Sequence, residues 1–170
     1  MTEPPSIGNR SHRAIRVATA ADIGEIVRVT NLAYRVEDFF INGNRTHADD
    51  VRARMRTVDA RFFVIEAAQP ETLAASVYAE RRGGHGHLGL LAVDPAEQRR
   101  GLARLLIRHV ETWCHQAGCA SLHIGVVNLR EALMGWYGTL GFEPFGTADF
   151  PDRHKLTREA HLVLMKKPIS

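Results

Sequence analysis

Residues 91–104, LAVDPAEQRRGLAR, join a short apolar segment to the clearest amphipathic helix of the chain. The apolar segment ends at Asp94-Pro95, and Gly101 opens a helix that we expect to run to Gln116. The first turn of such a helix presents backbone N–H groups without intrahelical acceptors and the positive end of the helix dipole, which together favour phosphate. Small residues at positions 101 and 103 and nearby arginines favour the same ligand, although neither a Walker P-loop nor a GxGxxG motif is present. An ordinary helix start with surface arginines is the alternative interpretation.

Hydrophobic periodicity places the remaining elements around this segment. We expect helices at residues 20 to about 35, 48–57, 101–116 and 130–139, and strands at 14–17, 61–68, 73–81, 87–93, 121–127, 142–145 and 161–165. The long helix should bury a stripe formed by Leu102, Leu105, Leu106, Val110, Trp113 and Cys114. Residues 146–160 are polar and predict a long loop. Short turns predict antiparallel neighbours, whereas the strands that flank the long helix should be parallel with a right-handed crossover, giving a mixed α/β (α+β) fold with helices on both faces.

Composition bounds the class of protein. The chain has 170 residues, 45% of them hydrophobic, which suits one compact domain; we expect it over residues 13–168, after a disordered segment at residues 1–12. A net charge of only +3 argues against nucleic-acid binding, and no apolar run is long enough to span a membrane. Cys114 and Cys119 are expected to be free thiols, and the chain to be cytoplasmic.

Two motifs carry a resemblance to a known family. Gln98-x-x-Gly101-x-Ala103, after a strand ending in Val93-x-Pro95, resembles the pyrophosphate-binding signature of the GNAT superfamily of acetyl-CoA-dependent N-acetyltransferases. A second segment, with Asn128, Ala132, Trp136-Tyr137 and Gly141-Phe142, resembles the other signature of that family. The resemblance implies that residues 13–168 form a single N-acetyltransferase domain. It also implies a mainly antiparallel, twisted sheet of about seven strands, in which the strands of Leu91 and Val126 splay apart to receive the cofactor.

The resemblance further implies roles for individual residues. The backbone N–H of Leu91 would stabilise the oxyanion, Tyr137 would protonate the leaving thiolate, and Asn128 would contact the cofactor or a bound water. A core tyrosine beside Trp136 is the alternative interpretation of Tyr137. The cofactor-binding residues implied are Leu91, Ala92, Val93, Gln98, Arg99, Arg100, Gly101, Leu102, Ala103, Arg104, Asn128 and Tyr137.

His87 is the candidate general base, because it stands where family members often carry a glutamate and some arylalkylamine acetyltransferases a histidine. Strand alternation would place it on the face of Gly89, Leu91 and Val93, with a pKa between roughly 5.5 and 7.5. Those arylalkylamine enzymes tend to carry a second histidine where this chain has Gly89, which weakens a link to them. A strand-edge histidine without a catalytic role is the alternative interpretation. Glu80 and Glu37 are the alternative bases.

The acceptor side is less specific. Tyr34, Phe39, Arg45 and His87 are the candidate substrate-binding residues, with core packing as the alternative for Phe39 and its neighbour Phe40. His85 and His87 form an H-x-H pair, but two imidazoles do not complete a zinc site, so we expect no metal.

The function expected is transfer of the acetyl group of acetyl-CoA to a primary amine by direct attack in a ternary complex. Direct attack is preferred because Cys114 and Cys119 occupy core-like positions that do not suit an acyl-carrying nucleophile. The acceptor is a small molecule or a peptide amine, with a protein N-terminus or lysine left open. A non-catalytic acyl-CoA sensor is the alternative of a different class, no nucleic-acid or membrane partner is expected, and a homodimer is left open.

Overall fold

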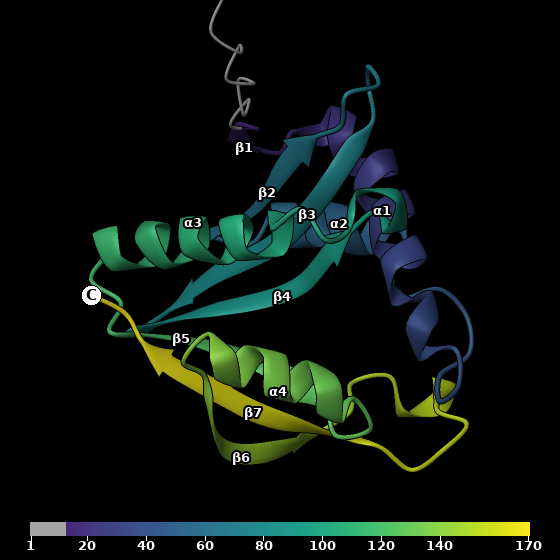
Figure 1. Cartoon of the computed structure of the whole chain (residues 1–170), viewed down its shortest axis with the longest axis vertical. Helices are drawn as coiled ribbons and strands as arrows, with labels where there is room; N and C mark the ends of the chain where they lie inside the picture. The colour runs from purple at the N-terminus through teal and green to yellow at the C-terminus, as the bar shows by residue number, and fades with distance from the viewer. Residues whose placement is uncertain (1–12) are drawn as a thin grey trace, which may run out of the picture.

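The computed structural model describes residues 13–170, which form a seven-stranded sheet with helices on both faces (Figure 1). The expected disorder of residues 1–12 lies outside the described residues. The strands are β1 (Ile15–Val17), β2 (Ala60–Glu66), β3 (Leu73–Arg82), β4 (His85–Val93), β5 (Ser121–Val127), β6 (Glu143–Asp149) and β7 (His161–Pro168). The helices are α1 (Ile23–Ala33), α2 (Ala48–Met55), α3 (Leu102–Gln116) and α4 (Glu131–Thr139).

The strands lie in the order β1-β2-β3-β4-β5-β7-β6. Neighbouring strands are antiparallel except β4 and β5, which are parallel and are connected through α3. Helices α1 and α2 cover one face of the first half of the sheet, and α3 and α4 cover the opposite face. This arrangement confirms the mixed fold with one parallel crossover that the sequence predicts.

Helix α3 is amphipathic, as its sequence indicates. Leu102, Leu106, Val110 and Cys114 recur every fourth position and are buried against the sheet. Ile107 is also buried, whereas Leu105, expected in the same stripe, lies at its border and is 37% exposed. Each fully buried aliphatic side chain stabilises the fold by about 1.5–3 kcal/mol, so this stripe fixes the helix firmly on the sheet.

The predicted loop over residues 146–160 is wrong at its beginning. Strand β6 continues to Asp149, which pairs with His161 of β7. The sequence conceals this pairing because β6 is an edge strand, exposed along almost its whole length, and therefore lacks the alternation of a half-buried strand. The rest of the segment contains a short 3-10 turn (Arg153–Lys155) and the buried ring of Phe150.

Gly86 provides a test of the packing between β4 and α3. A Cβ built at Gly86 would overlap Cys114 Sγ and lie 3.1 Å from Leu122 Cδ1. Gly86→Ala should therefore lower the free energy of unfolding by about 1–3 kcal/mol, measured by urea titration, because the core has no room for the methyl group. Gly84→Ala is the matched control, since a Cβ there meets nothing within 4 Å. In a Cys114→Ala background the sulfur is gone, so Gly86→Ala should lower the free energy of unfolding less. An equal loss in the two backgrounds would contradict this close contact.

Candidate active site

Strands β4 and β5 pair over only a short distance. Their register comprises His85 with Ser121, Gly86 with Leu122, and His87 with His123, although β4 continues to Val93 and β5 to Val127. Beyond His87 the two strands diverge, as the wedge between them in Figure 1 shows. Strand β5 pairs with β7 along its whole length, and β4 stays with β3. The facing edges of the divergent strands thus keep backbone groups that no sheet neighbour uses, as the fold class predicts.

A β-bulge shapes β4 at this divergence. Ser76 pairs with Ala92 while Tyr78 pairs with Gly89, so the single residue between them on β3 opposes two on β4, Leu90 and Leu91. Leu90 has φ 47°, a left-handed conformation that costs a side chain with a Cβ about 1–2 kcal/mol. Bulges of this kind re-aim side chains and are found next to active sites.

The bulge overturns one prediction about His87. The sequence places His87, Leu91 and Val93 on one face, but Leu91 and Val93 pack into the core beneath α3. Gly89 lies beside His87 and Tyr78, and Leu90 and Ala92 pack on that same side, beneath α1. The extra residue of the bulge shifts the alternation of β4 by one position, so His87 and the Leu91 side chain point to opposite faces.

The start of α3 has the geometry expected of an anion site. Arg99 and Gly101 both adopt left-handed backbone conformations, with φ 64° and 76°. Gly101 is the N-cap of α3 and supplies no side-chain cap, so the first N–H groups of the helix are free to bind a ligand. Glycine adopts such a φ without the cost that a Cβ imposes, which suits Gly101 to this turn, whereas Arg99 adopts it at a cost.

A cleft of about 570 Å³ extends from this helix start past the end of β4 to α4 and the end of α1. Most of the predicted cofactor residues line it, namely Leu91, Val93, Gln98, Arg99, Gly101, Leu102, Ala103, Arg104 and Tyr137. Among its other walls are residues that the sequence analysis missed: Ala33, Val36, Glu97, Arg130, Leu133 and Trp136. Four of the lining residues, at positions 130, 133, 136 and 137, recur at helical spacing, a signal that could have identified this face of α4.

Three predicted cofactor residues lie elsewhere. Ala92 is buried on the α1 side of the sheet, and Arg100 donates a hydrogen bond to Glu97 at 3.0 Å. Asn128 Oδ1 accepts the N–H of His161 at 2.9 Å, and the Asn128 N–H donates to the carbonyl of His161 at 2.9 Å. Asn128 therefore connects the end of β5 to the start of β7 by hydrogen bonds. Arg130, two residues later, lines the cleft.

Tyr137 projects from α4 into the cleft and is otherwise buried. Its ring packs edge-to-face against Trp136 and Phe142, at centroid distances of 5.0 and 5.5 Å. Burial raises the pKa of Tyr137 well above its ordinary value, with the nearby Tyr34 adding to the effect. The phenol consequently keeps its proton at neutral pH and can donate it.

His87 lies at the closed end of the wedge, opposite Glu80 in the β3–β4 ladder. Burial, followed by the charge of Arg82, lowers the pKa of His87 to about 4, below the range expected from the sequence. Three residues lie between His87 and Leu91, one of them in the bulge, so the two are at most about 13 Å apart along the strand. The imidazole is thus neutral at physiological pH, and its side chain lies on the opposite face of the sheet from that of Leu91.

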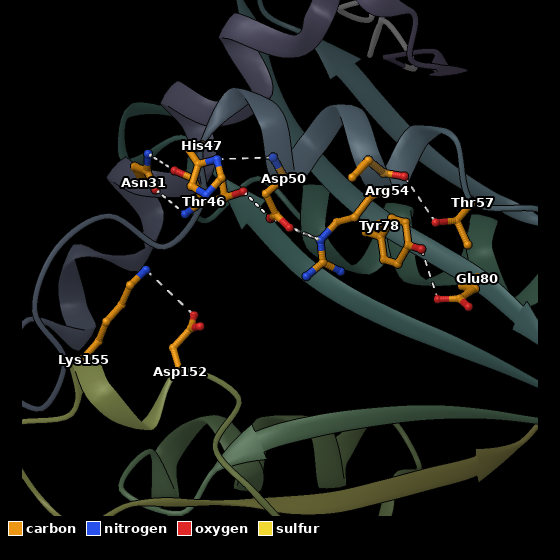
Figure 2. Close-up of polar contacts among 11 residues, drawn as sticks. Asn31, Thr46, His47, Asp50, Arg54, Thr57, Tyr78, Glu80, Asp152 and Lys155 are labelled. Carbon is orange, nitrogen blue, oxygen red and sulfur yellow. Dashed lines mark hydrogen bonds and ion pairs between the residues drawn. The ribbon is translucent and has the colours of Figure 1, made fainter.

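Glu80, one of the alternative bases, is already engaged. Its carboxylate accepts hydrogen bonds from the Tyr78 hydroxyl at 3.0 Å and from Arg82 at 2.9 Å, and the Arg82 bond lowers the pKa of Glu80. Figure 2 shows Tyr78 and Glu80 beside Arg54, whose guanidinium lies 5.1 Å from the Tyr78 ring centroid. Glu80 therefore belongs to a surface network rather than to the cleft.

The candidate acceptor residues separate into two groups. Tyr34 lines the cleft, and the Arg45 guanidinium lies 5.1 Å from the ring centroids of both Tyr34 and Phe150. Phe39 is 43% exposed and packs on Phe40, outside the cleft walls. The structure thus brings Tyr34 and Arg45 together and leaves Phe39 at the surface.

Two loops close this side of the molecule. The Asn42 N–H donates to the Lys155 carbonyl at 2.9 Å, and the Thr157 N–H donates to the Phe40 carbonyl at 2.8 Å. Figure 2 shows the neighbouring polar contacts. The Asn31 side chain makes two hydrogen bonds to the Thr46 backbone, and Lys155 forms an ion pair with Asp152. The α1–α2 loop and the β6–β7 segment are therefore one connected wall.

Within residues 13–170, no group of three or more His, Cys, Asp or Glu side chains is placed to hold a metal ion. His85 instead stacks on His123, with ring centroids 4.1 Å apart. None of the helices described is long and apolar enough to cross a membrane.

Comparisons with known proteins agree with this geometry. The chain is 28% identical over 144 residues to mycothiol acetyltransferase from Gordonia bronchialis, and the match covers 82% of this chain but only 46%, about half, of that relative. The fold resembles the ribosomal-protein-S18-alanine N-acetyltransferase from Escherichia coli, with TM-score 0.74, 21% identity and coverage of 93% and 94% of the two chains. It also resembles Ard1 from Thermoplasma volcanium, with TM-score 0.74, 15% identity and coverage of 92% and 97%. The acetyltransferase (GNAT) family model matches residues 29–142, and the chain therefore belongs to this family, whose members use acetyl-CoA as the acetyl donor.

Proposed function

We propose that this chain transfers the acetyl group of acetyl-CoA to a primary amine by direct attack in a ternary complex. One observation carries the proposal: a single cleft contains the uncapped start of α3, the unpaired edge of β4 at Leu91, and the Tyr137 phenol. These three features would bind a diphosphate, an extended amide-containing arm and a reacting thioester, in that order along the cleft. We also propose that residues 13–168 act as one catalytic domain.

The residues present fit acetyl-CoA. The N–H groups at the start of α3, with the side chains of Arg99 and Arg104, would hold the diphosphate. The unpaired backbone groups of β4 between Leu91 and Val93 would pair with the amides of the pantetheine arm, as an added strand does. The Leu91 N–H would then donate to the thioester oxygen as negative charge develops there.

The same geometry supports a donor and an acceptor for the protons that move during the reaction. Tyr137, protonated because it is buried, would donate its proton to the departing thiolate. His87 is neutral at physiological pH and would accept the amine proton through intervening water, as a weaker base than an ordinary histidine because its pKa is lowered. Cys114 is buried, which raises its pKa to about 12, and Cys119 is also buried. Neither thiol suits an acyl-enzyme intermediate, which supports direct attack.

The acceptor is proposed to be a small-molecule or peptide amine. The named relatives include a mycothiol acetyltransferase and an N-acetyltransferase of an alanine of ribosomal protein S18, and they indicate both classes. A non-catalytic acyl-CoA sensor is the weaker candidate, because it would not need the Tyr137 phenol inside the cleft.

Gly101 tests the cofactor site. Gly101→Asp should weaken acetyl-CoA binding by at least about tenfold in calorimetry, because a carboxylate would replace an open approach to the diphosphate. The control is Gly101→Asn, which has the same shape without the charge and tolerates the left-handed backbone better than most residues. Equal affinities for the folded Asp and Asn variants would contradict a diphosphate at this turn.

Tyr137 tests the chemistry. Tyr137→Phe removes one hydroxyl and little volume, so acetyl-CoA affinity should remain within about threefold while kcat falls about 10²–10⁴-fold, the usual contribution of a general acid. Steady-state rates with a good amine acceptor, together with calorimetry, provide the measurement. A fall in kcat of less than about threefold would exclude the general-acid role.

His87 tests the buried imidazole through stability. The folded state keeps the His87 pKa at about 4, against an ordinary value of 6.5, so between these values the unfolded chain is protonated at this site and the folded one is not. Stability should therefore fall as the pH is lowered from 6.5 towards 4, by up to about 3 kcal/mol from this group. Urea unfolding at several pH values should show a smaller fall for His87→Gln, and parallel curves would contradict the lowered pKa.

The same variant tests the catalytic part of His87. If the imidazole relays the amine proton, His87→Gln should lower kcat/KM at neutral pH by about tenfold or more, because glutamine has no comparable basicity. An unchanged rate would leave His87 with a packing role alone.

A further inference from the structure

Glu37 carries a buried oxygen whose hydrogen-bonding capacity is unused. The residue follows α1 and is only 4% exposed. Its Oε1 accepts a hydrogen bond from Arg130 Nη1 at 3.3 Å. Its Oε2 is buried, lies 3.8 Å from Arg45 Nη1 and has no hydrogen-bond partner. A buried carboxylate oxygen without a donor is costly, so it indicates a position where a ligand donor is expected.

A polar cavity surrounds this carboxylate. The cavity measures about 390 Å³ and is formed entirely by the end of α1 and the α1–α2 loop. Glu37 and Tyr34 both line it, and Tyr34 also lines the cofactor cleft. Arg130, the donor to Glu37, is itself a wall of the cofactor cleft. Glu37 therefore lies where the polar cavity approaches the cleft that contains Leu91 and Tyr137.

The remaining walls indicate what this cavity accepts. Three asparagines, Asn31, Asn42 and Asn44, contribute to it together with the charged side chains of residues 35, 38 and 45, and aromatic surface is limited to Tyr34. Amide and charged side chains bind hydroxyl or amide groups of a ligand better than a hydrocarbon or aryl group. The cavity is thus suited to a polar acceptor.

We propose that Glu37 receives the ammonium group of the acceptor, and that the acceptor is a cationic primary amine carried on a polar, hydroxyl- or amide-bearing body. This inference rests on the proposed acetyl transfer and names the acceptor class for it. An ammonium has three N–H donors, and one of them satisfies the unused Oε2. Arg130 and Arg45 hold the carboxylate at 3.3 and 3.8 Å, from the side of the cofactor cleft and from the loop.

The charges around Glu37 are consistent with this role. Desolvation by burial raises the pKa of Glu37 even though Arg45 and Arg130 oppose the shift. The neighbouring arginines therefore leave the carboxylate incompletely stabilised, and a bound ammonium would complete its environment. Tyr34 adds no charge, because burial raises the pKa of its phenol to about 12.

Two acceptors that differ in one atom separate this role from a structural one. 3-Amino-1-propanol is cationic at neutral pH, whereas O-(2-hydroxyethyl)hydroxylamine replaces the CH₂ next to nitrogen by oxygen and is uncharged there. Glu37→Gln should lower kcat/KM for the cationic acceptor by about 10–100-fold, mainly through KM, and change the uncharged one by less than about threefold. Glu37→Asp should restore part of the loss, because it retains the negative charge.

The control variant is Asp49→Asn, which removes a carboxylate that is 88% exposed on the neighbouring helix α2. It should leave both acceptors unchanged. Acetyl-CoA affinity, measured by calorimetry, should be retained in every folded variant. Equal losses on the two acceptors, or none, would overturn the proposal, since a residue that merely positions the two arginines affects both alike. If Glu37→Gln does not fold, the same comparison is made with Glu37→Asp, which should lose activity on the cationic acceptor alone.

A binding measurement distinguishes the two levels of the proposal. Calorimetry of 3-amino-1-propanol with the coenzyme A complex should show at least tenfold weaker binding for Glu37→Gln than for the wild type. Unchanged binding would overturn the assignment of Glu37 and leave acetyl transfer standing. Wild-type protein that binds this amine through Glu37 yet turns over no amine would instead overturn the proposed function.

Discussion

The divergence of β4 from β5 is the constraint on which the rest of the structure depends. Three residue pairs hold the two strands together. Beyond them β5 stays paired with β7, and β4 bends at its bulge at Leu90. Had the ladder continued, the backbone groups from Leu91 to Val93 would bond to β5 and no cleft would exist. Divergence leaves these groups for a ligand, and α3 and α4 form the walls of the space that it opens.

The turn that follows β4 is held in place by helix α1. Asp94 caps the N–H of Ala96 at 2.9 Å and accepts a hydrogen bond from Arg28 at 2.8 Å, and Arg28 also bonds to the Leu73 carbonyl. This partly buried ion pair fixes where the chain leaves the sheet and so where α3 begins. The start of α3, where we propose that the diphosphate binds, thus depends on side chains from α1, and Tyr34 and Glu37 follow just beyond the end of that helix. The proposed donor and acceptor sides of the site are therefore both connected to α1.

Sequence patterns predict the elements well because most are amphipathic and locally determined. The stripe of α3 and the Gly101 turn are readable from spacing, whereas the cofactor residues there are implied by the resemblance to the family, and most of them line the cleft. The bulge at Leu90 is not readable, since it depends on the register between two strands, and it reverses the predicted face of Leu91 relative to His87. Asn128 and Arg130 show the same limit of sequence patterns. They lie two residues apart after a strand, and which of them faces the cleft depends on the contacts that each makes in the fold.

The two halves of the proposed site would use different chemistry. The acetyl donor side would rely on backbone N–H groups at a helix start and a strand edge, which are present whatever side chains the residues carry. Solved structures at 15–21% identity match this fold with TM-score 0.74. The proposed acceptor side would rely on side chains such as Glu37 and Arg45, in a loop that backbone hydrogen bonds join to the β6–β7 segment. Because these bonds join the two segments, a change in the β6–β7 segment is expected to shift the loop that carries Glu37 and Arg45.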